Sequence, residues 1–160
     1  MRGLAVALAV ALAGCTTTAP TTAPTTTTVA ATVLDVPADL ARFPVATIEI
    51  DGGAVPVAVA DSRPLRVQGL RGIADLGDLA GMLFVFEAPS TASFTMRDVL
   101  IPLDLHHLDA DGTILEIISM EPCSGETCSF PTSVRFSYSL ETLPGAFDLS
   151  VGDRIGLPGR

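Results

Sequence analysis

Hydrophobic and polar residues alternate over much of the second half of this chain. Along residues 134–141 a hydrophobic side chain occupies every second position, which is typical of a β-strand with one buried face. Residues 55–59 repeat the pattern with three valines, and Asp51-Gly52-Gly53 before them suits a hairpin turn after a strand at 45–50. The pattern predicts strands rather than long helices.

Further strands are expected on either side of a second turn. Residues 101–108 and 113–120 flank Ala110-Asp111-Gly112, another sequence with hairpin chemistry. Residues 82–86 are continuously apolar, as in a strand that is covered on both sides. A last strand is expected at 154–157.

One or two short helices complete the prediction. Ser62 can cap a helix over residues 63–68, and Gly69 fits its end. A second helical turn is expected at 144–149. The fold class is therefore mainly β: a small barrel or sandwich with one or two short helices.

The N-terminus predicts export. Arg2 precedes an apolar run at residues 4–11, and Leu12-Ala13-Gly14-Cys15 follows it. This resembles a bacterial lipoprotein signal peptide, with an ordinary secretory leader as the alternative. The resemblance implies diacylglycerol on the Cys15 thiol and cleavage after Gly14. Acyl chains, palmitate among them, would hold the protein to a membrane on its extracytoplasmic side.

Composition divides the chain into three parts. Residues 1–14 are the predicted signal peptide, and residues 15–42 are a lipidated tether rich in Thr, Ala and Pro, too polar to bury a core. Residues 43–160 are expected to form a single β-rich domain.

The folded part is acidic. From Val45 onward it carries seven arginines against sixteen acidic residues, and the whole chain has a net charge of −9. Such a balance repels phosphate backbones, so nucleic acid is not an expected partner.

Cysteine usage agrees with export. If Cys15 carries lipid, Cys123 and Cys128 remain, and an exported chain meets an oxidising environment. A disulfide between Cys123 and Cys128 is expected. Four intervening residues argue against a thioredoxin-like redox pair.

An ordered series of motifs identifies a family. The chain resembles the domain of unknown function 192 family over about residues 55–155, which implies a small β-rich domain, often exported, without an established activity. The matching segments are Ala60-Asp61-Ser62, Gly69-Leu70, Gly81-Met82-Leu83-Phe84-Val85-Phe86, Phe94-Thr95-Met96-Arg97-Asp98, Leu100-Ile101-Pro102-Leu103-Asp104, Asp109-Ala110-Asp111-Gly112, Pro122-Cys123 with Cys128, and Val151-Gly152-Asp153.

Two segments depart from the family pattern. The family usually has Phe-Trp-Met-Lys-Asn where this chain has Phe94-Thr95-Met96-Arg97-Asp98, so a ligand there could differ from those of relatives. Arg71 replaces the usual methionine after Gly69-Leu70, which favours a solvated surface at that point.

The densest polar segment supplies the candidate ligand-binding residues Arg97, Asp98, Asp104 and His106. Asp104 and His106 are two apart on a predicted strand and should share a face, whereas His107 should point the opposite way. A carboxylate and an imidazole on one face can hold a metal or exchange protons. The favoured alternative is structural: Asp104 and His106 on a solvated face, with His107 hydrogen-bonded near the core.

Other residues give weaker signals. Met82, Phe84 and Phe86 are apolar enough to line a pocket, although such a run usually belongs to the core. No catalytic motif occurs, and no cofactor or resident metal is implied.

Three functions remain open. The domain is expected to be an envelope module that binds a small ligand, or one that binds a protein partner in a structural role through its acidic face. The alternative is a metal-assisted hydrolase of cell-envelope material that uses Asp104 and His106. The sequence favours binding over catalysis.

Overall fold

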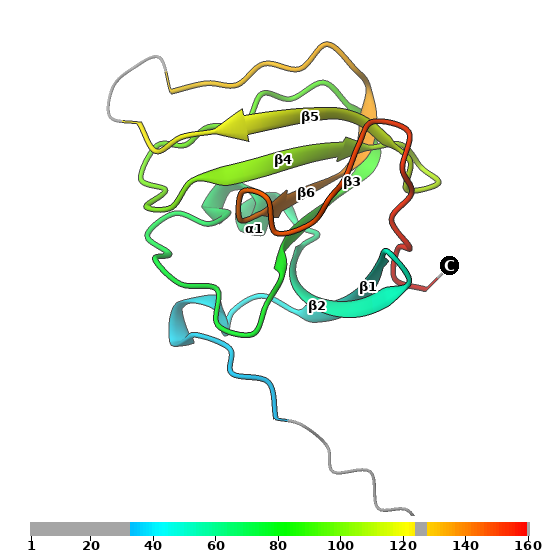
Figure 1. The fold of residues 1–160 in the computed structure, drawn as a ribbon. Helices are drawn as coiled ribbons and strands as arrows, with labels where there is room; N and C mark the ends of the chain where they lie inside the picture. Colours follow the sequence, from blue (N-terminus) through cyan, green and yellow to red (C-terminus); the bar gives the residue numbers. More distant parts are fainter. Residues whose placement is uncertain (1–32, 124–127, 160) are drawn as a thin grey trace, which may run out of the picture. The chain divides into compact units, whose positions relative to one another are not determined.

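The computed structural model describes residues 33–123 and 128–159, and contacts group residues 33–160 into one compact unit. The predicted signal peptide, Cys15 and the tether up to residue 32 lie outside the described residues. Figure 1 shows the elements of this unit. In chain order these are η1 (Ala38–Leu40), β1 (Val45–Ile50), β2 (Gly53–Ala60), α1 (Arg63–Gln68), β3 (Gly81–Ser90), β4 (Leu103–Leu108), β5 (Ile114–Met120) and β6 (Phe136–Thr142).

The six strands found in the described part of the chain belong to one sheet, in the order β1-β2-β3-β6-β4-β5. Neighbouring strands are antiparallel except β2 and β3, which are parallel and connected through α1. The mainly-β class is confirmed. The sheet is not closed, so the predicted barrel does not form.

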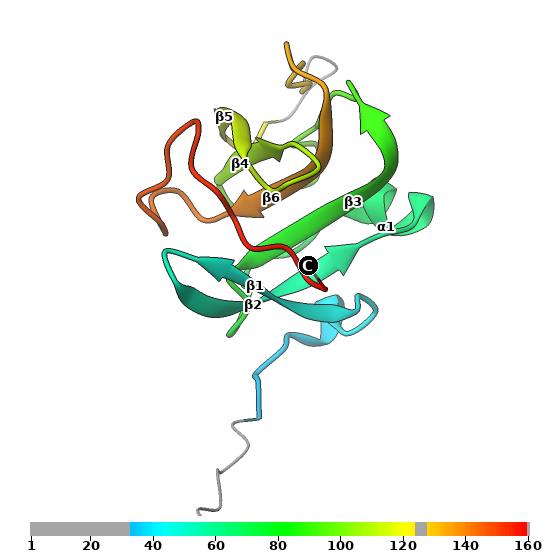
Figure 2. The same ribbon diagram turned by 90° about the vertical axis from the view of Figure 1, so that its right-hand side faces the viewer.

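The C-terminal segment lies between the two edges of the sheet. The backbones of Gly156 and Glu49 exchange two hydrogen bonds on the β1 side, and Ile155 N–H donates to the Gly112 carbonyl beside β5. Figure 2 shows this segment running past β1. The strand predicted at 154–157 is therefore reduced to isolated bridges, because each edge reaches it at only one or two residues.

The predictions that depend on local backbone geometry are confirmed for the first hairpin turn and for the bounds of α1. Asp51 and Gly52 both have positive φ, 52° and 74°, as a two-residue hairpin turn requires. Helix α1 has the predicted bounds and ends at Gly69, although Ser62 makes no side-chain capping bond. Residues 144–149 form a turn at 144–145 and a bend at 146–147 instead of the predicted helix: Gly145 has a φ of 66°, outside the helical region.

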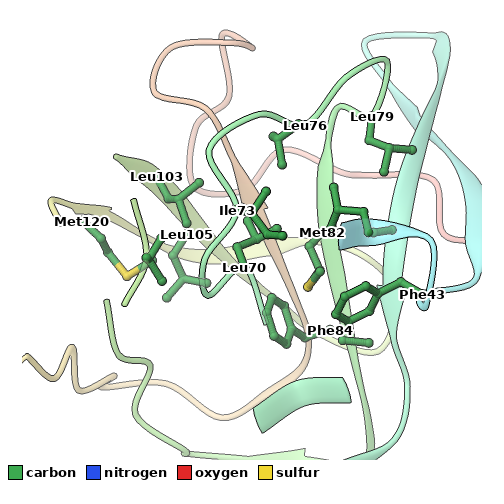
Figure 3. Close-up of a cluster of buried hydrophobic side chains, with 14 of the residues drawn as sticks. Phe43, Leu70, Ile73, Leu76, Leu79, Met82, Phe84, Leu103, Leu105 and Met120 are labelled. Carbon is green, nitrogen blue, oxygen red and sulfur yellow. The ribbon is translucent and has the colours of Figure 1, made fainter. Parts of the chain in front are cut away.

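Two hydrophobic clusters cover the two faces of the sheet. The first, shown in Figure 3, joins Met82 and Phe84 of β3 to Leu103 and Leu105 of β4. The second contains Leu83 of β3 and Leu140 of β6. Successive residues of β3 thus enter opposite clusters, so residues 82–86 form the predicted strand covered on both sides.

Strand β6 corrects a prediction. It was expected to bury one face only, but Ser139 is fully buried and Glu141 is 5% exposed. The reason is topological: β6 lies between β3 and β4, in the middle of the sheet. Gly81 of β3 allows this packing, because a Cβ there would collide with the Glu141 carbonyl.

Residues before β1 also pack on the domain. Leu40 is fully buried in the first cluster together with Phe43. Asp35 N–H donates to the Asp78 carboxylate, and Asp78 N–H donates to the Asp35 carbonyl. The domain boundary predicted at residue 43 thus falls within a packed segment.

Candidate functional site

A pocket of about 430 Å³ lies where α1, the middle of β3 and the loop after β3 meet. Its volume falls in the range of pockets that hold small organic molecules. The lining residues are Arg63, Arg66, Val67, Gln68, Gly69, Leu70, Arg71, Phe84, Phe86, Ala92, Ser93, Phe94, Thr95, Val99 and Glu141.

Aromatic side chains form much of the pocket wall. The rings of Phe84 and Phe94 meet edge to face with centroids 5.1 Å apart. The position of Phe94 is fixed through its backbone, which exchanges two hydrogen bonds with the backbone of Phe130. Of the three apolar residues considered from sequence, Phe84 and Phe86 line the pocket, whereas Met82 is wholly buried in the core.

Glu141 contributes a carboxyl group to this apolar surrounding. The β-sheet register places it directly between Met82 on β3 and Leu105 on β4, both fully buried. Burial raises the pKa of Glu141 to about 8, because the charged form loses its hydration there. Its side chain has no hydrogen-bond partner among the described residues. The pocket therefore holds an unpartnered carboxylic acid that is mostly neutral at pH 7.

Arginines surround the same pocket. Arg66 Nη1 donates to the carbonyls of Asp61 and Val85, at 2.9 and 2.8 Å, and its guanidinium lies 5.1 Å from the Phe86 ring centroid. Arg63 and Arg71 lie on either side along the chain and also line the pocket. The arginines add positive charge to an otherwise acidic protein.

His107 of β4 and Ser139 of β6 are paired on the same face of the sheet as Glu141. His107 Nδ1 is hydrogen-bonded to Ser139 Oγ at 2.8 Å, and its ring stacks on Phe136. Burial lowers the pKa of His107 to about 4 despite the nearby charge of Glu116. His107 Nε2 is buried without a partner in the described part of the chain. The expected hydrogen-bonded core histidine is present.

Asp104 and His106 occupy the opposite face of the sheet. Asp104 accepts hydrogen bonds from Ser119 Oγ at 2.7 Å and from the backbone N–H of Gly145 at 3.1 Å. His106 Nδ1 donates to the Leu140 carbonyl. Burial lowers the pKa of His106, opposed by that hydrogen bond and by Asp104. The solvated face predicted for His106 is wrong: the residue is only 4% exposed.

Arg97 and Asp98 lie in the exposed loop between β3 and β4. Asp98 has a φ of 63°, a conformation that Asp and Asn tolerate better than most residues, and its carbonyl accepts the Gly72 N–H. Neither residue lines the pocket, and Asp104 and His106 lie across the sheet from the face on which this loop packs. The structure does not bring the four predicted residues into one site.

The predicted disulfide adjoins the segment that is bridged to Phe94 in the pocket wall. Cys123 and Cys128 are joined in a disulfide with α-carbons 5.8 Å apart. Backbone bridges link Cys123 to Arg97 and Phe130 to Phe94. The disulfide therefore constrains the segment against which the Phe94 wall rests.

Other candidate features are less developed. A second hollow, lined mainly by polar residues, lies beside the β1–β2 turn and the C-terminal segment. Within residues 33–123 and 128–159, no three His, Cys, Asp or Glu side chains gather as metal ligands. The same residues include no helix of the length and hydrophobicity needed to span a membrane.

The fold and the pocket define a small β domain with a cavity on one face of an open sheet. The chain belongs to the domain of unknown function 192 family, described as uncharacterized ACR, whose model matches residues 46–157. A comparison with curated proteins gave no match.

Two crystal structures resemble this fold. A protein from Sinorhizobium meliloti 1021, described as a candidate transcription regulator, is 24% identical with a TM-score of 0.61, over 71% of this chain and 93% of its own. A protein of unknown function from Novosphingobium aromaticivorans DSM 12444 is 22% identical with a TM-score of 0.64, over 79% and 94% respectively. At these identities the similarity establishes the fold alone.

Sequence reasoning missed Glu141, Arg63 and Arg66. Glu141 occupies a polar position of an alternating strand and was therefore expected to face solvent. Arg71 gave a partial signal as a departure from the family pattern. No local pattern states that β6 is central, so the burial of Glu141 could not be deduced from its neighbours in sequence.

Proposed function

We propose that this protein is an envelope lipoprotein whose β domain binds a small organic ligand in the pocket between α1, β3 and the loop after β3. The observation that carries the proposal is Glu141, a nearly fully buried carboxyl group that lines the pocket without a partner. Because the fold supplies no partner for this carboxyl group, a ligand in the pocket can form a hydrogen bond with it.

The pocket also has the composition of a binding site. Apolar walls provide area that a ligand can remove from water, and a few polar groups converge on the same space. Asp104 and His106, by contrast, already bond to Ser119, Gly145 and Leu140 within the fold. Binding in the pocket thus has stronger support than a metal-assisted hydrolase built on Asp104 and His106.

Ligand binding is tested with residues 33–160, which contain both hydrophobic clusters in one compact unit. The melting temperature is measured against a small-molecule library and a panel of divalent metals. Ser93→Trp, on the exposed rim of the pocket, should abolish a ligand-induced shift. Thr91→Trp, exposed but outside the lining, is the matched control and should retain it.

The outcomes separate the candidate functions. A shift that both tryptophan variants retain would place the ligand elsewhere and contradict the pocket. One equivalent of bound metal, lost in Asp104→Ala, would favour the hydrolase. No response to either panel would favour recognition of a protein partner.

The lipid anchor is tested separately in the full chain. Its basis is the apolar run at residues 4–11 followed by Leu12-Ala13-Gly14-Cys15, with a Thr-, Ala- and Pro-rich tether. The processed protein should partition into detergent-soluble membrane fractions, whereas Cys15→Ser should leave it unacylated and release it from them. Equal membrane association of both forms would refute the anchor.

A further inference from the structure

Positive charge is concentrated around the pocket. Arg63, Arg66 and Arg71 all line it, and none forms an ion pair with a described residue. Among the described residues that line the pocket, Glu141 alone carries a carboxyl group. In a chain with a net charge of −9, such a local surplus of cations attracts anions selectively.

Arg66 is oriented in advance. Its Nη1 atom donates to the carbonyls of Asp61 and Val85, and its guanidinium carbon lies over the Phe86 ring. Nε and Nη2 have no hydrogen-bond partner among the described residues. A guanidinium edge of this kind binds a carboxylate or phosphate through two parallel hydrogen bonds.

Glu141 does not neutralise these arginines. Buried between Met82 and Leu105, it keeps its proton at neutral pH because desolvation raises its pKa. A protonated carboxyl group can donate a hydrogen bond to the ligand and can lie beside an uncharged polar group of it. A cationic ligand would meet three positive side chains and no fixed negative charge, so the charges favour an anion.

We propose that the ligand of this pocket is an organic oxyanion, a carboxylate or phosphate joined to an apolar body. Its charged group binds Arg66, flanked by Arg63 and Arg71, and its body lies against Phe84, Phe86 and Phe94. This assignment rests on the proposed function, because it names the class of ligand for the same pocket.

The test uses probes that share an apolar body and differ only in the head group. Calorimetric titration of residues 33–160 compares octanoate, octyl phosphate, octanol and octylamine, and a second set compares 3-phenylpropanoate, 3-phenylpropanol and 3-phenylpropylamine. We expect the anions to bind at least about tenfold more tightly than the matching alcohols, and the amines more weakly still.

Variants locate the effect. Arg66→Gln should weaken anion binding about tenfold or more and leave alcohol binding unchanged. The double variant Arg63→Gln/Arg71→Gln should weaken anion binding too. Because it leaves the carbonyl contacts of Arg66 intact, it provides the test if Arg66→Gln fails to fold. Arg42→Gln, exposed and outside the lining, removes the same charge and should change nothing.

The possible results distinguish failure of the oxyanion assignment from failure of the pocket as a binding site. Equal binding of anions, alcohols and amines, lost in Ser93→Trp, would overturn the oxyanion assignment while supporting the pocket as a binding site. Tighter binding of the amines would overturn it as well. If none of the probes binds and the library of the preceding section gives no shift, both proposals fail. If the library gives a shift with uncharged compounds only, the oxyanion assignment fails alone.

Discussion

Asp104 and Glu141 are carboxyl groups on adjacent strands of one sheet, yet their surroundings differ. Asp104 is partly exposed and accepts hydrogen bonds from Ser119 and Gly145, so it holds the turn after β6 against β5. Glu141 points to the other face, is nearly fully buried and has no partner among the described residues. The bonds of Asp104 are completed within the fold, whereas the carboxyl group of Glu141 is open to the pocket, where we propose that a ligand binds.

The largest expected effect is on the pocket side. Glu141→Gln should stabilise the domain at pH 9 by on the order of 4 kcal/mol, because it removes the penalty of a buried ionisable group. Unfolded Glu141 ionises near pH 4.5 and folded Glu141 near pH 8, so raising the pH through this window favours the unfolded chain. Denaturant unfolding of both proteins at pH 4, 6 and 9 measures the difference.

The difference should vanish at pH 4, where Glu141 is neutral in both states. A Glu141→Gln variant that is destabilised equally at all three pH values would show that the carboxyl group is satisfied within the fold. The contrast with Asp104 would then disappear.

Stability at acidic pH should depend on His107, which lies on the same face of the sheet as Glu141. Its pKa is about 4 in the folded chain and near 6.5 when unfolded, so lowering the pH from 6.5 to 4 favours the unfolded chain. His107→Gln should flatten this loss, which amounts to roughly 3 kcal/mol in the native protein. Thermal unfolding between pH 4 and 7 provides the measurement, and an unchanged slope would contradict the buried, neutral imidazole.

Removing the disulfide should affect both stability and the pocket. Replacing Cys123 and Cys128 together with serine should cost about 2 kcal/mol by the chain-entropy relation for a short loop. It should also weaken ligand binding, because the Phe94 wall rests on the adjoining segment. Chemical unfolding and calorimetric titration of the double variant measure the two effects. Unaltered affinity would show that the wall is held without the disulfide.

Asp104 provides the matching test on the opposite face. Asp104→Ala should destabilise the domain by about 1–2 kcal/mol through the loss of two hydrogen bonds at a partly exposed site. Ligand affinity in the pocket should be unchanged, since Asp104 does not line it. A loss of affinity at constant stability would restore Asp104 to the binding site predicted from sequence.

The smallest effect is expected at Arg97. This side chain is exposed and outside the pocket, so Arg97→Ala should change the free energy of unfolding by less than about 0.5 kcal/mol. Affinity for the octanoate probe should also be unchanged. A tenfold loss of octanoate affinity would show that the loop after β3 reaches the ligand beyond its pocket-lining residues.

Sequence alone located features that depend on neighbours along the chain. The bounds of α1 and the turn at Asp51-Gly52 follow from backbone conformational preferences, and the pairing of Cys123 with Cys128 follows from the cysteine count in a chain expected to be exported. The same local logic failed for residues 144–149, where Gly145 turns the chain and the carboxylate of Asp104, distant in sequence, binds its N–H.

The tertiary structure decided which polar side chains are buried. Alternation along β6 says that Glu141 and Leu140 face opposite ways, and this is true. It does not say which strands flank β6 or what covers each face, because these depend on pairings between residues far apart in the chain. The sequence therefore determined a mainly β domain with its turns, helix and disulfide. The alternation along the strand predicted a solvent-facing Glu141. Only the tertiary structure, which places β6 between β3 and β4, shows that Glu141 is a buried acid beside three arginines.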